Sequence, residues 1–91
     1  MVVVLTSMAR TRDWRALARL NRDGLLGRMR EAGATRYRIY RNARDAAQLL
    51  VVAELPDHET AGELGPELAK LLEGAVSDDR VWEPTDLDGI G

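Results

Sequence analysis

Residues Val2 to Met8 read VVVLTSM, and residues Gln48 to Leu55 read QLLVVAEL. Both stretches are rich in aliphatic and β-branched side chains, without the alternation of apolar and polar positions that marks a half-exposed strand. The pattern predicts two strands that are buried on both faces. Pro56 ends the second one, since proline has no N–H to donate to a sheet. The other elements must therefore pack around two buried strands.

A helical pattern follows the first of these strands. At about 100° per residue, one helix face collects Trp14, Leu17, Ala18, Asn21, Leu25, Met29 and Ala32, and four arginines lie away from it. Thr11 is the predicted N-cap, and Gly33 is a natural residue to end the helix. Gly24 and Gly27 each cost about 1 kcal/mol relative to alanine. We therefore expect a kink or a short second segment near them.

The stretch from Thr35 to Arg41 alternates strictly. Thr35, Tyr37 and Ile39 fall on one face and Arg36, Arg38 and Tyr40 on the other, which is typical of a strand with one solvent-exposed face. The small polar residues 42–47 then suit a hairpin turn into the second apolar strand. This segment is predicted to be an edge strand joined to its neighbour by a hairpin.

A second helix is predicted after Pro56, with Asp57 as its N-cap. Pro66 removes a helical hydrogen bond and disfavours the helical conformation at Gly65, so we expect the helix to restart at Pro66. A short strand from Arg80 to Glu83 and an acidic tail, residues 85–91, follow. The apolar face of this second helix collects Ala61, Leu64, Leu68, Leu72, Ala75 and Val76.

These elements follow one another in the order βαββαβ, the ferredoxin-like arrangement. In that α+β fold, a four-stranded antiparallel sheet carries two helices on one face, and its first and third strands are central. The two fully apolar stretches take those central positions, while arginines or a proline mark the edges. The uncovered sheet face would show Val, Leu and Tyr side chains to water. We therefore expect two copies to pack face to face as a homodimer.

The length of 91 residues allows one domain, residues 1–91. A chain of this size buries only about 60 to 65% of its unfolded surface, and it has no cysteine with which to form stabilising disulfides. The longest apolar run, Val2 to Leu5, is far shorter than the roughly 18 residues of a membrane span. We predict a reduced, cytoplasmic protein with no membrane partner.

The net charge of −2 is the sum of a basic first half and an acidic second half of the chain. Residues 1–45 carry eleven arginines against four acids, and residues 46–91 carry two bases against eleven acids. Pairing within or between chains is the simpler use of this asymmetry, so no nucleic-acid partner is predicted. We expect the acidic C-terminal segment to lie near the basic residues 36–41. With one histidine, no cysteine and no phosphate-binding motif, neither a metal nor a cofactor is predicted.

Four stretches resemble a known group of proteins: Asp13-Trp14, GATRYRIYR at residues 33–41, Pro66-Glu67-Leu68 and Val81-Trp82-Glu83. Over nearly its whole length the chain resembles the dimeric α/β-barrel superfamily. Within it, the likeness is to small antibiotic-biosynthesis-monooxygenase-like and polyketide-cyclase-like proteins of actinomycete type. The resemblance implies a cofactor-independent enzyme of secondary metabolism that oxygenates or cyclises an aromatic or polyketide intermediate in a helix–sheet pocket. The alternative is a non-catalytic small-molecule-binding or assembly module of the same fold.

Three polar side chains are the catalytic candidates. Asn21 lies in the middle of the apolar helix face, where an unpaired amide costs roughly 1 to 3 kcal/mol; its partner is a backbone group, a water molecule or a ligand carbonyl. Tyr37 either packs in the core or stabilises a developing enolate. His58 is either a general acid or base, because histidine titrates near neutral pH, or a solvated residue near Glu59.

Three larger side chains are the substrate-binding candidates. Trp14 and Trp82 either stack on a planar ligand or pack in the core or dimer interface. Arg28 lies on the same side of the first helix as Asn21 if that helix continues through its two glycines. Together they predict a pocket that holds an aromatic substrate.

Overall fold

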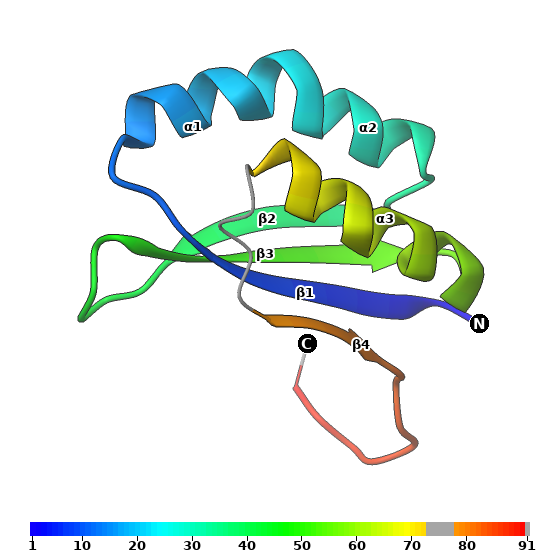
Figure 1. The fold of residues 1–91 in the computed structure, drawn as a ribbon. Coiled ribbons are helices and arrows are strands. Elements are labelled where there is room, and N and C mark those ends of the chain that lie inside the picture. The colour runs from blue at the N-terminus through cyan, green and yellow to red at the C-terminus, as the bar shows by residue number, and fades with distance from the viewer. Residues whose placement is uncertain (73–77, 91) are drawn as a thin grey trace.

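The computed structural model describes residues 1–72 and 78–90. Within them the strands form a four-stranded antiparallel sheet of order β2-β3-β1-β4, and the helices cover one of its faces (Figure 1). The predicted α+β ferredoxin-like fold is confirmed. The elements are β1 (Val3–Arg10), α1 (Trp14–Leu20), η1 (Asn21–Leu25), α2 (Leu26–Glu31), β2 (Arg36–Arg41), β3 (Gln48–Leu55), α3 (His58–Leu71) and β4 (Asp78–Trp82).

The central strands β1 and β3 are each buried on one face only. Their alternate side chains lie under the helices, while the residues between them are partly exposed. The prediction of burial on both faces is wrong for the single chain, because no described segment covers the far side of the sheet (Figure 1). The buried set is Val3, Leu5, Ser7, Ala9, Leu49, Val51, Ala53 and Leu55.

The first helix is capped by Asp13, not by Thr11 as predicted. The Asp13 side chain accepts hydrogen bonds from the N–H groups of Arg15 and Ala16 at 3.0 and 3.1 Å. Thr11 instead accepts from the Asp13 N–H at 3.3 Å. The prediction was two residues early because the carboxylate reaches the free N–H groups of the first turn directly.

The same helix ends at Gly33, as predicted, in a Schellman motif. The Gly33 N–H donates to the Arg30 carbonyl at 3.1 Å, and the Ala34 N–H donates to the Met29 carbonyl at 3.0 Å. Gly33 has a φ of 80°, a left-handed conformation in which glycine carries no Cβ penalty.

A single π-helical turn, η1, joins α1 to α2 in place of a break. The inward-facing residues Leu17, Asn21, Leu25 and Met29 are spaced by four. In an α-helix, with about 3.6 residues per turn, each four-residue step drifts about 40° around the axis. The wider π turn removes that drift, so Leu17, Leu25 and Met29 all remain buried against the sheet. The expected irregularity near Gly24 is thus a change of pitch in a continuous helix.

The second helix, α3, runs unbroken through Pro66, so the predicted restart is wrong. The clash that normally disfavours helix before a proline involves the Cβ of the preceding residue, and Gly65 has none. Gly65 is buried, and a Cβ placed there would lie 3.3 Å from an Asp79 carboxylate oxygen. The predicted helical positions Ala75 and Val76 lie outside the described residues.

Strand β4 forms the edge beside β1 and begins two residues earlier than predicted. Fully buried Ser7 donates a hydrogen bond to Asp79 at 2.7 Å and ties the two strands together. Because β2 and β4 are opposite edges, the acidic C-terminal segment does not lie beside basic β2 within one chain. None of the helices among residues 1–72 and 78–90 combines the length and apolar character needed to cross a membrane.

Candidate functional site

An open cavity of about 450 Å³ lies between the helices and the sheet, where β1 leaves toward α1. This volume falls in the range of about 300 to 1,000 Å³ that is typical of small-molecule sites. One part of its wall is formed by leucines of α1, β3 and the end of α3, and another part by the connecting segment. The leucines are Leu17, Leu20, Leu49, Leu71 and Leu72, and the segment is Arg10, Thr11, Arg12 and Asp13.

Two of the three catalytic candidates contact each other above the sheet. The Tyr37 hydroxyl donates a hydrogen bond to the amide oxygen Oδ1 of Asn21, and both side chains are half-buried. Asn21 is the first residue of η1, and Tyr37 faces the helices from β2. Leu17 in the cavity wall precedes Asn21 by one helical turn. Neither member of the pair lines the open cavity itself.

The surroundings of this pair determine that Tyr37 is the donor and Asn21 the acceptor. Burial raises the pKa of Tyr37 to about 12, so the phenol keeps its proton at neutral pH and acts as a donor. Asn21 Oδ1 is thereby occupied, which orients the side-chain amide. In the described part of the chain, the amide NH₂ of Asn21 donates no hydrogen bond. The pair therefore presents an oriented N–H donor in the layer between helix and sheet.

His58 lies elsewhere. It begins α3, as predicted, but its Nε2 pairs with Glu83 Oε1 at 2.9 Å, and both side chains are more than half exposed. Glu83 follows β4 at one edge of the sheet, and Tyr37 is on β2 at the other edge. Three inter-strand spacings of about 4.8 Å separate these edges by about 14 Å. The structure does not bring His58 to Asn21 and Tyr37.

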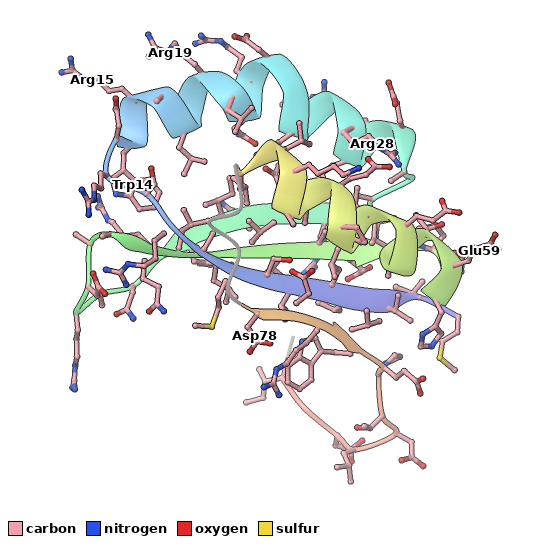
Figure 2. All side chains as sticks on the ribbon, viewed as in Figure 1. Trp14, Arg15, Arg19, Arg28, Glu59 and Asp78 are labelled. Carbon is pink, nitrogen blue, oxygen red and sulfur yellow. The ribbon has the colours of Figure 1, made fainter. Side chains whose placement is uncertain are left out.

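Trp14 lies where α1 begins, between the helix and the β2–β3 hairpin (Figure 2). Its indole N–H donates to the Ala46 carbonyl at 2.7 Å, and the Arg41 guanidinium lies 5.5 Å from the ring centre. This is a cation–π contact of ordinary geometry. Trp14 directly follows Asp13 of the cavity wall, so it fixes the hairpin beside the cavity mouth.

The other two substrate-binding candidates have partners of their own. Arg28 donates to Glu67 through Nε at 2.5 Å and Nη2 at 2.9 Å, joining α2 to α3 (Figure 2). The pairing with Glu67 raises the pKa of Arg28. Trp82 is half exposed on the sheet face away from the helices and donates to Thr6 Oγ1 at 2.7 Å. Neither side chain lines the helix–sheet cavity.

Sequence reasoning missed the π turn and the polar cavity wall. The four-residue spacing of Leu17, Asn21, Leu25 and Met29 was the available signal for the π turn, because an ideal helix cannot keep that spacing on one face. The wall depends on how β1 enters α1, for which the sequence carries no local pattern. Among residues 1–72 and 78–90, no three acidic or histidine side chains gather as a metal site.

Comparison with known proteins shows that the fold also occurs in other solved structures. Neither family models nor curated proteins gave a match. Solved structures match the fold over most of the chain. An EthD family protein from Bacillus halodurans is 16% identical with a TM-score of 0.63, over 93% of this chain and 100% of its own.

Two candidate antibiotic biosynthesis monooxygenases have the same fold. The one from Deinococcus radiodurans is 15% identical, with a TM-score of 0.61 over 100% of this chain and 99% of its own. The one from Bordetella bronchiseptica is 14% identical, with a TM-score of 0.61 over 94% and 98%. The chain therefore has the ferredoxin-like fold of the antibiotic-biosynthesis-monooxygenase-like proteins, as the resemblance implied.

Proposed function

We propose that this protein is a small, cofactor-independent enzyme of secondary metabolism, and that it oxygenates or cyclises an aromatic or polyketide intermediate bound between helices and sheet. The observation that carries the proposal is the hydrogen bond from Tyr37 to Asn21, which orients an amide donor one helical turn beyond the cavity wall. We also propose that the protein is located in the cytoplasm.

The chemistry begins at an acidic carbon that is either next to a ligand carbonyl or, as in an anthrone, conjugated with it across the ring. That carbon loses a proton to water, and the electron pair moves onto the carbonyl oxygen. The N–H of Asn21 stabilises the resulting enolate by a hydrogen bond that strengthens as the charge develops. For cyclisation, the enolate carbon bonds to a second carbonyl carbon of the same ligand, and the alkoxide that forms takes a proton back from water. For oxygenation, the enolate carbon bonds to dioxygen, and the peroxide that forms takes up a proton and loses water, which leaves a new carbonyl at that carbon. Tyr37 is a positioning residue, because its proton is donated to Asn21.

Two further observations support the proposal. The cavity has an apolar wall of leucines suited to a planar ligand, and its volume fits a small molecule. Two of the proteins with the same fold are candidate antibiotic biosynthesis monooxygenases. His58 is given no role in the reaction, because it is paired with Glu83 at the opposite sheet edge.

Turnover of hydroxylated naphthalenes and anthrones, followed with an oxygen electrode and by chromatography, tests the proposal. We expect Asn21→Leu to lower the rate by about a hundredfold or more, as loss of one oxyanion donor does elsewhere. Asn42→Ala, in the hairpin, is the matched control and should leave the rate unchanged. Oxygen uptake identifies oxygenation, and product without uptake identifies cyclisation or isomerisation. Binding of these compounds without any product would contradict the enzyme proposal.

The second candidate function is a non-catalytic small-molecule-binding or assembly module. The position of His58 favours it, since within the described residues no histidine accompanies the Asn21–Tyr37 pair. In this case Asn21→Leu weakens ligand binding by removing a donor, and no product forms with any of the compounds.

We also propose that the protein is a homodimer. The sheet face away from the helices bears a groove of about 770 Å³ over β2 and β3, and Tyr40 and Trp82 are 52% and 50% exposed there. A second copy would cover this face through a two-fold, self-complementary interface. The apolar and aromatic side chains of the face are Val4, Met8, Tyr40, Leu50, Val52 and Trp82.

A further inference from the structure

We propose that the polar wall of the helix–sheet cavity is a carboxylate-recognition site, with Arg12 as the residue that binds the ligand's acidic group. The proposal rests on the proposed function in placing the ligand in this cavity, and it adds the class of ligand, an aromatic acid. The wall comprises Arg10, Thr11, Arg12 and Asp13.

Among residues 1–72 and 78–90, some charged side chains of this wall have hydrogen-bonding partners, and one does not. Arg10 pairs with Asp45 in the hairpin, at 2.9 and 3.4 Å. The Asp13 carboxylate accepts hydrogen bonds from two backbone N–H groups of the first turn of α1. Arg12 has no ion pair and no hydrogen bond to its side chain within the described residues. The donors of its guanidinium therefore remain available to a ligand.

The backbone of the wall is held in place from both sides. The Thr11 N–H donates to the Ala47 carbonyl of the hairpin at 2.8 Å, and the Thr11 hydroxyl accepts from the Asp13 N–H at 3.3 Å. Residues 10–12 also line a smaller hollow of about 250 Å³ together with Ala47. Residues 10–12 thus line both hollows, and Arg12 belongs to the lining of the main cavity.

The ligand class follows from the two parts of the cavity wall, one charged and one apolar. A planar guanidinium forms paired hydrogen bonds with a carboxylate, a geometry that an ammonium group cannot reproduce. The leucines that line the same cavity suit an apolar aromatic ring system. Asn21 follows Asp13 by eight residues along the helix, which is about 12 Å at about 1.5 Å per residue. A fused-ring acid bound with its carboxylate at Arg12 extends along Leu17 toward Asn21.

Equilibrium binding of two matched fluorescent probes tests the site. Anthracene carboxylate and the neutral anthracene carboxamide have nearly the same shape and differ in charge at neutral pH. We expect the protein to bind the carboxylate about threefold or more tightly than the carboxamide, the size of preference that an ion pair of the exposed Arg12 supports. Arg12→Gln should abolish this preference, and Arg12→Lys should restore part of it.

Two further variants locate the effect. Arg15→Gln removes a charge from the outer face of α1, where Arg15 points away from the sheet (Figure 2), and should leave the preference unchanged. Ala16→Trp fills the cavity from an exposed position of α1 and should weaken binding of both probes. Circular dichroism checks that each variant is folded.

Three results would overturn the inference. Arg12→Gln could keep the full preference for the carboxylate, or it could lose affinity for both probes equally. The third is that the unmodified protein binds neither probe. Because the measurement involves no turnover, its outcome is separate from that of the enzyme proposal. Turnover that depends on Asn21, without any preference for the carboxylate, would leave the proposed function standing and remove this site.

Discussion

Asn21 and Tyr37 connect the helical layer to the edge strand β2 through one hydrogen bond between half-buried side chains. Removing either group leaves the other without its partner, which costs about 1 kcal/mol or more in a partly desolvated position. The bond thus contributes to stability whether or not a ligand is present. Its functional role has to be separated from this structural one by comparing stability with activity.

A double-mutant cycle on this pair should show strong coupling. We expect Tyr37→Phe and Asn21→Leu each to lower the free energy of unfolding by about 1 to 2 kcal/mol, and the double variant to lose clearly less than the sum. Urea denaturation followed by circular dichroism measures all four proteins. Additive losses would show that the two side chains do not interact in solution.

The pair between Arg28 and Glu67 predicts a pH dependence of stability. The hydrogen bonds from Arg28 lower the pKa of Glu67. Because the folded pKa lies below the unfolded one, the contribution of Glu67 is present at neutral pH and is lost as the pH falls through the lowered pKa. The side chains are 30% and 41% exposed, so solvent screening limits the contribution to about 1 kcal/mol at most.

We therefore expect Glu67→Gln to be less stable than the unmodified protein at pH 7. The difference should shrink below the ordinary carboxyl range, about pH 4. Thermal melts in matched buffers measure it. If the difference in melting temperature stayed constant from neutral to acidic pH, the loss of stability would come from packing and not from the charge of Glu67.

At the scale of elements, alanine substitutions at Gly27, within α2, and at Gly33, just after it, should change the stability in opposite directions. At Gly27 a Cβ would meet nothing within 4 Å, and alanine favours helix by about 1 kcal/mol. At Gly33 the φ of 80° costs a side-chain-bearing residue about 1 to 2 kcal/mol. Gly27→Ala should raise the melting temperature and Gly33→Ala should lower it. Equal shifts would contradict the observed helix end.

The order and boundaries of the elements were largely predictable because each depends on local chemistry. Alternation identified β2, Asp57 identified the start of α3, and Gly33 identified a helix end. Where the course of a helix was predicted wrongly, a non-local contact or a missing atom decided the outcome. The absent Cβ of Gly65 let α3 continue, and the sheet beneath the first helix favoured a π turn over a break.

The candidate site was predictable only in part. Asn21 stood out because a polar residue on an apolar face needs a partner, and Tyr37 proved to be that partner. Nothing local in the sequence placed His58 beside Glu83, because residues 58 and 83 meet only through the arrangement of α3 and β4. The cavity wall at residues 10–13 likewise exists only once β1, the hairpin and α1 have assembled.

For the whole molecule, the open sheet face predicts self-association. Val52 lies on that face at the centre of the sheet, beside Arg38 of β2 and Thr6 of β1. Val52→Lys should convert a dimer into a monomer by placing a charge in the interface, whereas Ala18→Lys on the exposed side of α1 should have no effect. Sedimentation velocity distinguishes the two. A monomer for the unmodified protein at micromolar concentration would refute the homodimer.

Salt should weaken this dimer modestly. Basic β2 and the acidic segment around β4 lie at opposite edges of one sheet, so they meet only if two copies pack against each other. Exposed pairs contribute about 0 to 1 kcal/mol each, and raised ionic strength screens them. Sedimentation equilibrium across a salt series measures the change. A dimer indifferent to salt would be held by apolar burial alone.

The central claim is that Asn21, held by Tyr37, donates its amide hydrogens to a ligand carbonyl. The sequence contains two asparagines, Asn21 and Asn42, and one glutamine, Gln48, so the side-chain NH₂ signals in a nitrogen–proton correlation spectrum are few. The Asn42 amide donates to Gln48 at 2.6 Å in the hairpin and serves as the internal reference.

Titrating the uniformly labelled protein with anthrone, and comparing it with Tyr37→Phe, is the most direct test. We predict that the Asn21 NH₂ signals shift to lower field and exchange more slowly with solvent, that the Asn42 signals stay in place, and that the response is reduced in Tyr37→Phe. Binding of anthrone with no change at the Asn21 amide would contradict the account.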